Sequence, residues 1–181
     1  MLARVTERTA GLGAWAGMQI GPDQAALLEM LTRFGGVTNA VEVGTFTGTS
    51  ALCIARGLAP GGRLLCCDVS EEWTAIATDA WSEAGVDDRI DLRIAPAAET
   101  LAQLPSEPMI DLAFIDADKG GYLTYYEELV VRMRPGGWVV ADNTLWSGAV
   151  LDDANTCLLY TSDAADDMQC VDLGGRRIIK K

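Results

Sequence analysis

The sequence contains no histidine, which removes the side chain most often used as a general base and as a zinc ligand. Any proton transfer must therefore use a carboxylate, Lys, Tyr or Cys. Basic residues are also few: 14 Lys and Arg stand against 26 Asp and Glu, which gives the 181-residue chain a net charge of −12. We see no local basic patch, and such a charge repels nucleic-acid phosphates and anionic membranes. Neither nucleic acid nor a membrane is therefore expected as a partner.

Long apolar runs and paired cysteines are absent as well. No run approaches the length of a membrane-spanning helix, and the first residues, including Arg4, Glu7 and Arg8, do not build the apolar core of a signal peptide. The five cysteines form no Cys-x-x-Cys pair, and Cys66 and Cys67 are adjacent in an apolar run. We therefore expect reduced, buried cysteines and a cytoplasmic location.

The chain does have a regular alternation of short apolar runs and amphipathic segments from residue 40 onward. With 49% hydrophobic residues, it can bury the core of one domain. The alternation predicts an α/β fold, a parallel sheet with helices on both faces. The predicted strands are Ala40–Gly44, Leu64–Asp68, Ile90–Ile94, Ile110–Asp116 and Trp138–Asp142, with helices near 47–58, 70–84, 97–104 and 120–134.

Two helices are predicted before the first strand. The first covers residues 4–16, and its Gly11–Ala16 end formally matches a dinucleotide fingerprint, which we reject because no strand precedes it. Pro22 begins the second, with Leu27, Met30, Leu31 and Phe34 on one face. In the helix over 70–84, Ser70 is the expected N-cap, and Trp73 and Trp81 are interpreted as packing residues.

A glycine turn follows the first predicted strand. Gly44 and Gly48 permit backbone geometry that a Cβ would block, and the hydroxyl residues after them can cap a helix. Backbone N–H groups at a helix N-terminus attract anionic groups, so the segment predicts a cofactor-binding turn. Its spacing, Glu-x-Gly-x-x-x-Gly, lacks the pattern of dinucleotide-binding proteins. The alternative is an ordinary turn with two glycines.

Three predicted strands, the second, fourth and fifth, end in or run into Asp residues, and parallel strands bring the carboxyl ends of all five to one edge. Asp68 is placed to accept hydrogen bonds from both hydroxyls of a ribose, and a helix cap is the alternative. Asp116, Asp142 and Asn143 supply three hard oxygen ligands, which suits Mg²⁺ or a similar cation. A cation would also let these acids and Asp118 remain ionised together. Turn and cap residues are the alternative.

Four segments, in this order and spacing, resemble the cation-dependent O-methyltransferases of the caffeoyl-CoA and catechol type. They are Glu42–Leu52, Cys67–Ser70, Phe114–Lys119 and Asp142–Gly148. The first is similar to the first motif of class I S-adenosylmethionine-dependent methyltransferases. The resemblance implies a Rossmann-like class I methyltransferase fold with strand order 3-2-1-4-5. It also implies methylation of a small catechol-like or phenolic hydroxyl.

The same resemblance implies roles for individual residues. Asp116, Asp142 and Asn143 would bind Mg²⁺ or another divalent cation. Lys119 would be the base, beside Asp116 in the catalytic centre. A homodimeric parent protein is also implied. The implied contacts to S-adenosylmethionine are Ile20, Glu42, Gly44, Thr45, Gly48, Ser50, Asp68, Ala97 and Asp118.

Three alternatives stay open. A nicotinamide-dependent oxidoreductase could use a similar sheet, although the fingerprint after the first strand and a Tyr-x-x-x-Lys pair are both absent. A tRNA hydroxyuridine methyltransferase belongs to the same family, although the negative charge argues against it. The chain could also be an inactive fragment that only binds the cofactor.

Residues 157–181 do not continue the family pattern and resemble an in-frame translation of a sequencing adapter. We therefore expect a methyltransferase domain over residues 1–156, truncated at its C-terminus and, by resemblance, at its N-terminus, followed by a non-native tail. On this interpretation the family's final C-terminal hairpin is missing. A genuine strand at Cys157–Thr161 is the alternative.

Overall fold

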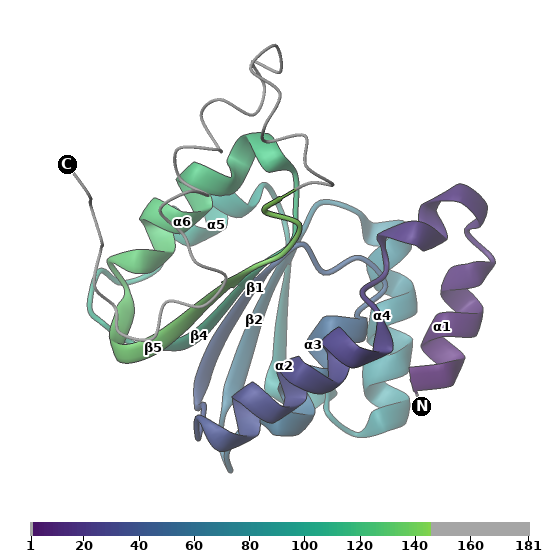
Figure 1. The fold of residues 1–181 in the computed structure, drawn as a ribbon, viewed down its shortest axis with the longest axis horizontal. Helices are drawn as coiled ribbons and strands as arrows, with labels where there is room; N and C mark the ends of the chain where they lie inside the picture. Colours follow the sequence, from purple (N-terminus) through teal and green to yellow (C-terminus); the bar gives the residue numbers. More distant parts are fainter. Residues whose placement is uncertain (1, 146–181) are drawn as a thin grey trace.

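The computed structural model describes residues 2–145, which build a five-stranded parallel sheet with helices on both faces (Figure 1). The order is β3-β2-β1-β4-β5, as predicted. Every neighbouring pair of strands is parallel, so the carboxyl ends share one edge. The strands are β1 Asn39–Val43, β2 Arg63–Asp68, β3 Ile90–Ile94, β4 Ile110–Ile115 and β5 Met133–Ala141.

Two hydrophobic layers cover the sheet. Alternate residues of β4 show the division, because Leu112 and Phe114 pack into one layer while Ala113 and Ile115 pack into the other. The first layer holds α1 Leu2–Ala10, α2 Pro22–Phe34, α3 Thr49–Gly57 and α4 Glu71–Ala84, and the second holds α5 Ala97–Ala102 and α6 Tyr122–Val130. Short 3₁₀ turns are η1 Gly13–Met18, η2 Asp87–Arg89 and η3 Lys119–Gly121.

Helix α4 begins and ends where the sequence predicts. The Ser70 side chain accepts a hydrogen bond from the Trp73 backbone N–H at 3.2 Å, and Gly85 ends the helix with a φ of 66°. The helix expected over 120–134 is shorter, however. Helix α6 stops at Val130 and β5 already begins at Met133. Pro135 and the two following glycines lie within this strand, and Met133 pairs with Ile110 before an irregularity in the register.

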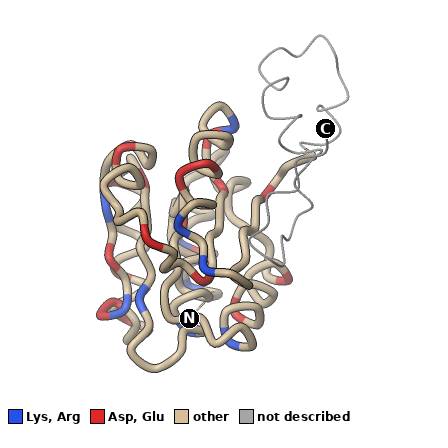
Figure 2. The backbone as a smooth tube through the Cα atoms, turned by 90° about the vertical axis from the view of Figure 1, so that its left-hand side faces the viewer, with Lys and Arg blue, Asp and Glu red and all other residues tan. Residues whose placement is uncertain are grey.

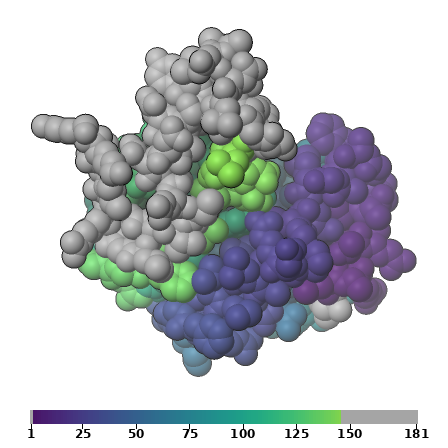
Figure 3. All heavy atoms as spheres, viewed as in Figure 1, coloured from purple at the N-terminus to yellow at the C-terminus, as the bar shows by residue number. Residues whose placement is uncertain are grey.

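The first predicted helix is also shorter than expected, since α1 stops at Ala10 and a 3₁₀ turn covers Gly13–Met18. The apolar face predicted for α2 does not face the core. Leu27, Met30 and Phe34 are 51%, 51% and 77% exposed, on a helix that lies at the surface in Figure 3. The buried residues are smaller on average: Ala25, Leu28 and Thr32.

Close packing between α2 and α3 explains why the smaller residues of α2 are the buried ones. A Cβ built on Gly57 of α3 would lie only 2.7 Å from both the Glu29 carbonyl oxygen and the Thr32 Cβ of α2. The two helices therefore approach through small residues, which the larger apolar side chains of α2 would prevent.

Cys53, Cys66 and Cys67 are buried free thiols, as predicted. None of the helices within residues 2–145 has both the length and the apolar character needed to cross a bilayer. Lys and Arg are scattered among Asp and Glu along the described chain (Figure 2). The predicted tail and the hairpin that we expect to be missing both concern residues outside 2–145.

Candidate active site

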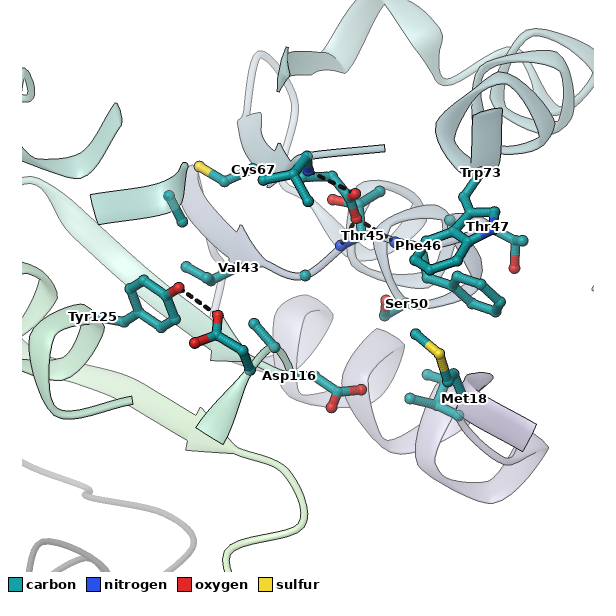
Figure 4. Close-up of a pocket in the computed structure, with 18 of the residues that line it drawn as sticks. Met18, Val43, Thr45, Phe46, Thr47, Ser50, Cys67, Trp73, Asp116 and Tyr125 are labelled. Carbon is teal, nitrogen blue, oxygen red and sulfur yellow. Dashed lines mark hydrogen bonds between the residues drawn. The ribbon is translucent and has the colours of Figure 1, made fainter. Parts of the chain in front are cut away.

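A cavity of about 600 Å³ opens at the carboxyl ends of the strands, and most of the predicted site residues line it (Figure 4). Its walls come from the turn after β1, from the ends of β2 and β4, and from η1. Glu42 and Asp142 are the two predicted residues that are not part of this lining. The predicted residues in the lining are Ile20, Gly44, Thr45, Gly48, Ser50, Asp68, Ala97, Asp116, Asp118, Lys119 and Asn143.

The glycine turn has the geometry that the sequence predicts. Gly44 and Gly48 have φ values of 90° and 82°, and Phe46 between them has a φ of 50°. A Cβ on Gly44 would lie 1.9 Å from the Asp116 carbonyl oxygen, and one on Gly48 would lie 2.5 Å from the Ala77 Cβ. The turn is therefore held between β4 and α4, with no space for side chains at either glycine.

Asp68 fixes this turn to the end of β2. One carboxylate oxygen accepts hydrogen bonds from the N–H groups of Thr45 and Phe46, at 2.9 and 2.8 Å. The other accepts from the N–H groups of Val69 and Ser70, at 2.7 and 2.8 Å. These four bonds fill the usual accepting capacity of a carboxylate. The predicted ribose acceptor is thus also a backbone anchor, a role that the sequence did not suggest.

Glu42 lies beneath the cavity and is fully buried. Its Oε2 accepts a weak hydrogen bond from the Cys66 thiol at 3.5 Å, whereas Glu42 Oε1 and the Thr45 hydroxyl have no hydrogen-bond partner within residues 2–145. Burial raises the pKa of Glu42 to about 8. A buried polar pair without partners costs stability, and such atoms are often satisfied by a ligand or water.

Asp116 and Asp142, at the ends of adjacent strands, form an acidic pair. Burial first, and then the charge of Asp142, raise the pKa of Asp116 to about 6, while Lys119 lowers it. Asn143 follows with a φ of 53°, and its amide donates to the Asp142 carboxylate at 3.0 Å. Within residues 2–145, no group of three or more His, Cys, Asp or Glu side chains is placed to hold a metal ion. The predicted set would therefore depend on the Asn143 amide oxygen as its third ligand.

Lys119 is half-buried beside this pair. Its Nζ donates to the Tyr122 hydroxyl at 2.5 Å and to the Asp142 carbonyl oxygen at 2.9 Å, and it lies 4.0 Å from the centre of the Tyr122 ring. The Tyr122 hydroxyl in turn donates to the same carbonyl at 3.0 Å. Burial lowers the pKa of Lys119. Tyr122 was not predicted as a site residue, although its spacing three residues after Lys119 was a usable signal.

Two further aromatic residues of the site, Tyr125 and Trp73, were not predicted as site residues. The Tyr125 hydroxyl donates to Asp118 Oδ1 at 2.6 Å, which orients that carboxylate within the cavity. Trp73 was interpreted as a packing residue, but it lines the cavity and contacts Phe46 and Trp15. The interpretation was right for Trp81, which is 2% exposed and donates from its ring to the Gly48 carbonyl at 3.2 Å. Helical spacing predicts that Trp73 and Trp81 both face inward. It does not show whether such a residue packs in the core or lines the cavity.

Comparison with known proteins identifies the family and supports the fold. A family model described as "O-methyltransferase" matches residues 1–162. The chain belongs to this O-methyltransferase family. A "Probable caffeoyl-CoA O-methyltransferase 2" of Dictyostelium discoideum is 41% identical over 133 residues, which cover 72% of this chain and 58% of that protein. The chain spans about half to three-fifths of the length of the curated relatives it matches.

Solved O-methyltransferase structures share the fold. The chain superimposes on the O-methyltransferase TomG from Streptomyces achromogenes, solved in complex with SAM, with a TM-score of 0.84 and 27% identity over 92% of this chain and 76% of that one. The O-methyltransferase from Bacillus cereus, solved in complex with SAH, gives a TM-score of 0.83 and 30% identity over 91% of this chain and 76% of that one.

Proposed function

We propose that this O-methyltransferase family member binds S-adenosylmethionine and transfers its methyl group to a small phenolic or catechol-like hydroxyl with the help of a divalent cation. The observation that carries the proposal is one cavity that unites the glycine turn, Asp68 and Asp118 with the acidic end formed by Asp116 and Asn143. The two similar proteins solved with SAM and SAH support the choice of cofactor.

The residues present fit this cofactor. A cavity of about 600 Å³ is large enough for a nucleoside with an amino-acid tail. Asp68, Ala97 and Asp118 would hold the nucleoside, with Tyr125 orienting Asp118. The amino-acid tail of the cofactor would be held by Ile20, Gly44, Thr45, Gly48 and Ser50.

The acidic end fits a divalent cation. Burial and, after it, the charge of Asp142 raise the pKa of Asp116, and Asn143 follows Asp142 directly with an amide oxygen. Oxygen donors of this kind suit Mg²⁺. When bound there, the cation would lower the pKa of a phenolic hydroxyl. Asp116, Asp142 and Asn143 would hold it.

In the proposed reaction, Lys119 would receive the phenolic proton. Its Nζ lies beside Asp142, and burial favours its neutral form, which can accept a proton. Tyr122 and the Asp142 carbonyl hold this nitrogen in place. The remaining contribution of the cavity walls is alignment of the acceptor oxygen with the methyl group.

Calorimetry with the whole chain tests the proposal. S-adenosylhomocysteine should bind with and without EDTA, because the nucleoside residues do not depend on the cation. NAD should bind at least tenfold more weakly. Methyl transfer from labelled S-adenosylmethionine to a catechol should require Mg²⁺ and stop in EDTA. Tighter binding of NAD than of S-adenosylhomocysteine would refute the cofactor assignment, and full turnover in excess EDTA would refute the cation.

A further inference from the structure

One wall of the cavity comes from a segment that the hydrophobic core does not hold. The 3₁₀ turn η1 covers Gly13–Met18, and none of residues 13–18 is buried. Met18 and the following Gln19 nevertheless line the cavity, and Figure 4 shows Met18 at the end opposite Tyr125. We call residues 13–19 the lid. Its position must come from contacts other than core packing.

A set of polar side chains joins the lid to the glycine turn. The Gln19 amide donates to the Thr49 hydroxyl at 2.5 Å and to the Thr9 hydroxyl at 3.3 Å. The hydroxyls of Thr9 and Thr47 are in turn hydrogen-bonded to each other at 2.8 Å. The three threonines are buried, so breaking these bonds would leave polar atoms without ready access to water. We call Thr9, Gln19, Thr47 and Thr49 the latch.

Other contacts of the lid are weak. Trp15 lies against the Trp73 ring with centroids 5.6 Å apart, but it remains 57% exposed. A Cβ built on Gly13 or Gly17 would meet no atom within 4 Å, so the backbone of the lid is not closely packed there. Segments with few buried apolar contacts open locally at a low cost in free energy. The latch is therefore the main restraint on opening of the lid.

The latch lies at the cavity itself. Gln19, Thr47 and Thr49 line the cavity, whereas Thr9 is not among the residues of 2–145 that line it. Breaking the bond between Gln19 and Thr49 would let the lid move away from the start of α3 and would widen the cavity on that side. Lids that open in this way control ligand exchange, and product release often limits the turnover of an enzyme.

We propose that residues 13–19 form a lid that gates exchange of the cofactor, and that Gln19 is the positioning residue that holds the lid closed. This inference rests on the proposed function, because it takes S-adenosylmethionine as the ligand of the cavity, and it adds control of entry and release. The bonds of the latch join protein groups only, so they stabilise the closed lid with or without cofactor. Weakening the latch should therefore accelerate both binding and release.

Rate measurements on the whole chain distinguish a gate from an ordinary ligand contact. Surface plasmon resonance gives the association and dissociation rate constants of S-adenosylhomocysteine. Gln19→Met keeps a side chain of similar length without the amide, and it should raise both rate constants by about three- to tenfold. Their ratio, the Kd, should change by less than about twofold, because the closed lid is weakened equally in the free and bound chain. Loss of a direct ligand contact would instead raise the dissociation rate constant alone.

Thr9→Val tests the latch from outside the cavity lining. Valine has nearly the same shape as threonine, but it lacks the hydroxyl that accepts from Gln19 and bonds to Thr47. Both rate constants should rise about two- to fivefold. Thr9→Ser keeps the hydroxyl and should return them to the values of the unmodified chain. Thr9→Val decides the question if Gln19→Met does not fold.

Thr32→Val is the matched control. Thr32 is a fully buried threonine of α2 whose hydroxyl donates to the carbonyl four residues earlier, as that of Thr9 does in α1. Thr32 is not among the residues of 2–145 that line the cavity or that belong to the latch. Thr32→Val should therefore leave both rate constants unchanged, even if it lowers the unfolding free energy as much as Thr9→Val does.

Unchanged rate constants in both Gln19→Met and Thr9→Val would overturn the inference and leave the cofactor assignment intact. A faster dissociation with an unchanged association rate constant would also overturn it, because the latch residues would then act on the bound ligand alone. Equal acceleration in Thr32→Val would overturn it as well, since lost stability would be the cause. Failure of S-adenosylhomocysteine to bind the unmodified chain would overturn the proposed function, and this inference with it.

Discussion

The carboxylate of Asp68 holds the backbone of Phe46: its Oδ2 accepts a hydrogen bond from the Phe46 N–H at 2.8 Å. Phe46 has a φ of 50°, a conformation that is uncommon for residues other than glycine and is stable only when its surroundings fix it. Asp68 thus supports the turn that carries the Phe46 ring into the cavity lining. A ribose bound by Asp68 would have to share this carboxylate with the backbone.

Replacing Asp68 with Asn should therefore weaken both the fold and the cofactor site. The amide N–H₂ would face backbone N–H groups that now bind a carboxylate oxygen, which should cost about 1–3 kcal/mol of unfolding free energy. The affinity for S-adenosylhomocysteine should fall at least tenfold. Urea denaturation and calorimetry measure the two effects.

Asp91→Asn is the control, since Asp91 is an exposed residue of β3 whose carboxylate pairs with Arg93. It should change neither quantity appreciably. If Asp68→Asn reduced cofactor affinity while the unfolding free energy stayed the same, Asp68 would act on the ligand alone and its role as a backbone anchor would be wrong.

Gly44→Ala should be among the most destabilising single substitutions in the chain. The new Cβ would lie 1.9 Å from the Asp116 carbonyl oxygen, and the backbone has a φ of 90°. Gly61→Ala separates these two causes, because Gly61 has a φ of 78° but no atom within 4 Å of its built Cβ. We expect a loss of about 1–2 kcal/mol for Gly61→Ala from backbone strain alone.

The loss for Gly44→Ala should be larger, above about 3 kcal/mol, because main-chain atoms of β1 and β4 must move apart. Urea denaturation of both variants provides the comparison. Equal losses of unfolding free energy in the two variants would mean that the close approach of Gly44 to the Asp116 backbone adds nothing to the cost of the substitution.

The sequence was sufficient to predict the sheet order and the edge that carries the site. Strand order came from the family resemblance, and the edge followed from the Asp residues at the ends of three of the apolar runs, such as Asp68 and Asp116. Helix α4 was also predictable, since Ser70 and Gly85 are local signals at its two ends.

What the sequence could not provide were contacts between distant segments. Trp73 and Trp15 are 58 positions apart, so helical spacing alone could not show that they meet at the cavity. The exposure of the apolar face of α2 could not be predicted for a similar reason. The close approach of α3 to α2 at Gly57 decides which face of α2 is buried. Tertiary packing overrides the amphipathic pattern there.

Glu42→Gln should change how the stability of the ligand-free chain depends on pH. The pKa of Glu42 is about 8 in the fold against 4.5 for the free side chain, so the folded chain binds more protons than the unfolded chain between these values. The stabilisation of the fold by protonated Glu42 is fully present below pH 4.5 and is lost as the pH rises toward 8. Each unit of pKa difference corresponds to about 1.4 kcal/mol, so the loss is on the order of a few kcal/mol.

Unfolding free energies measured at several pH values between 5 and 8 check this expectation. The unmodified chain should lose stability over this range, and Glu42→Gln should remove much of the decline. A smaller decline should remain, because burial and Asp142 also raise the pKa of Asp116, from 3.8 to about 6. A Glu42→Gln variant that declined as steeply as the unmodified chain would show that Glu42 titrates normally.

Tyr122→Phe and Tyr125→Phe should separate catalysis from cofactor binding. Both remove one hydroxyl and keep the ring, but the Tyr122 hydroxyl contacts Lys119 and the Asp142 carbonyl, whereas that of Tyr125 contacts Asp118. In the proposed reaction, Tyr122→Phe should lower kcat about two- to tenfold, the effect of one hydrogen bond, and leave the Kd of S-adenosylhomocysteine unchanged. Tyr125→Phe should raise that Kd by a similar factor with little change in kcat. Steady-state kinetics with a catechol and calorimetry supply the two measurements, and the same pattern in both variants would contradict the separate roles of the two tyrosines.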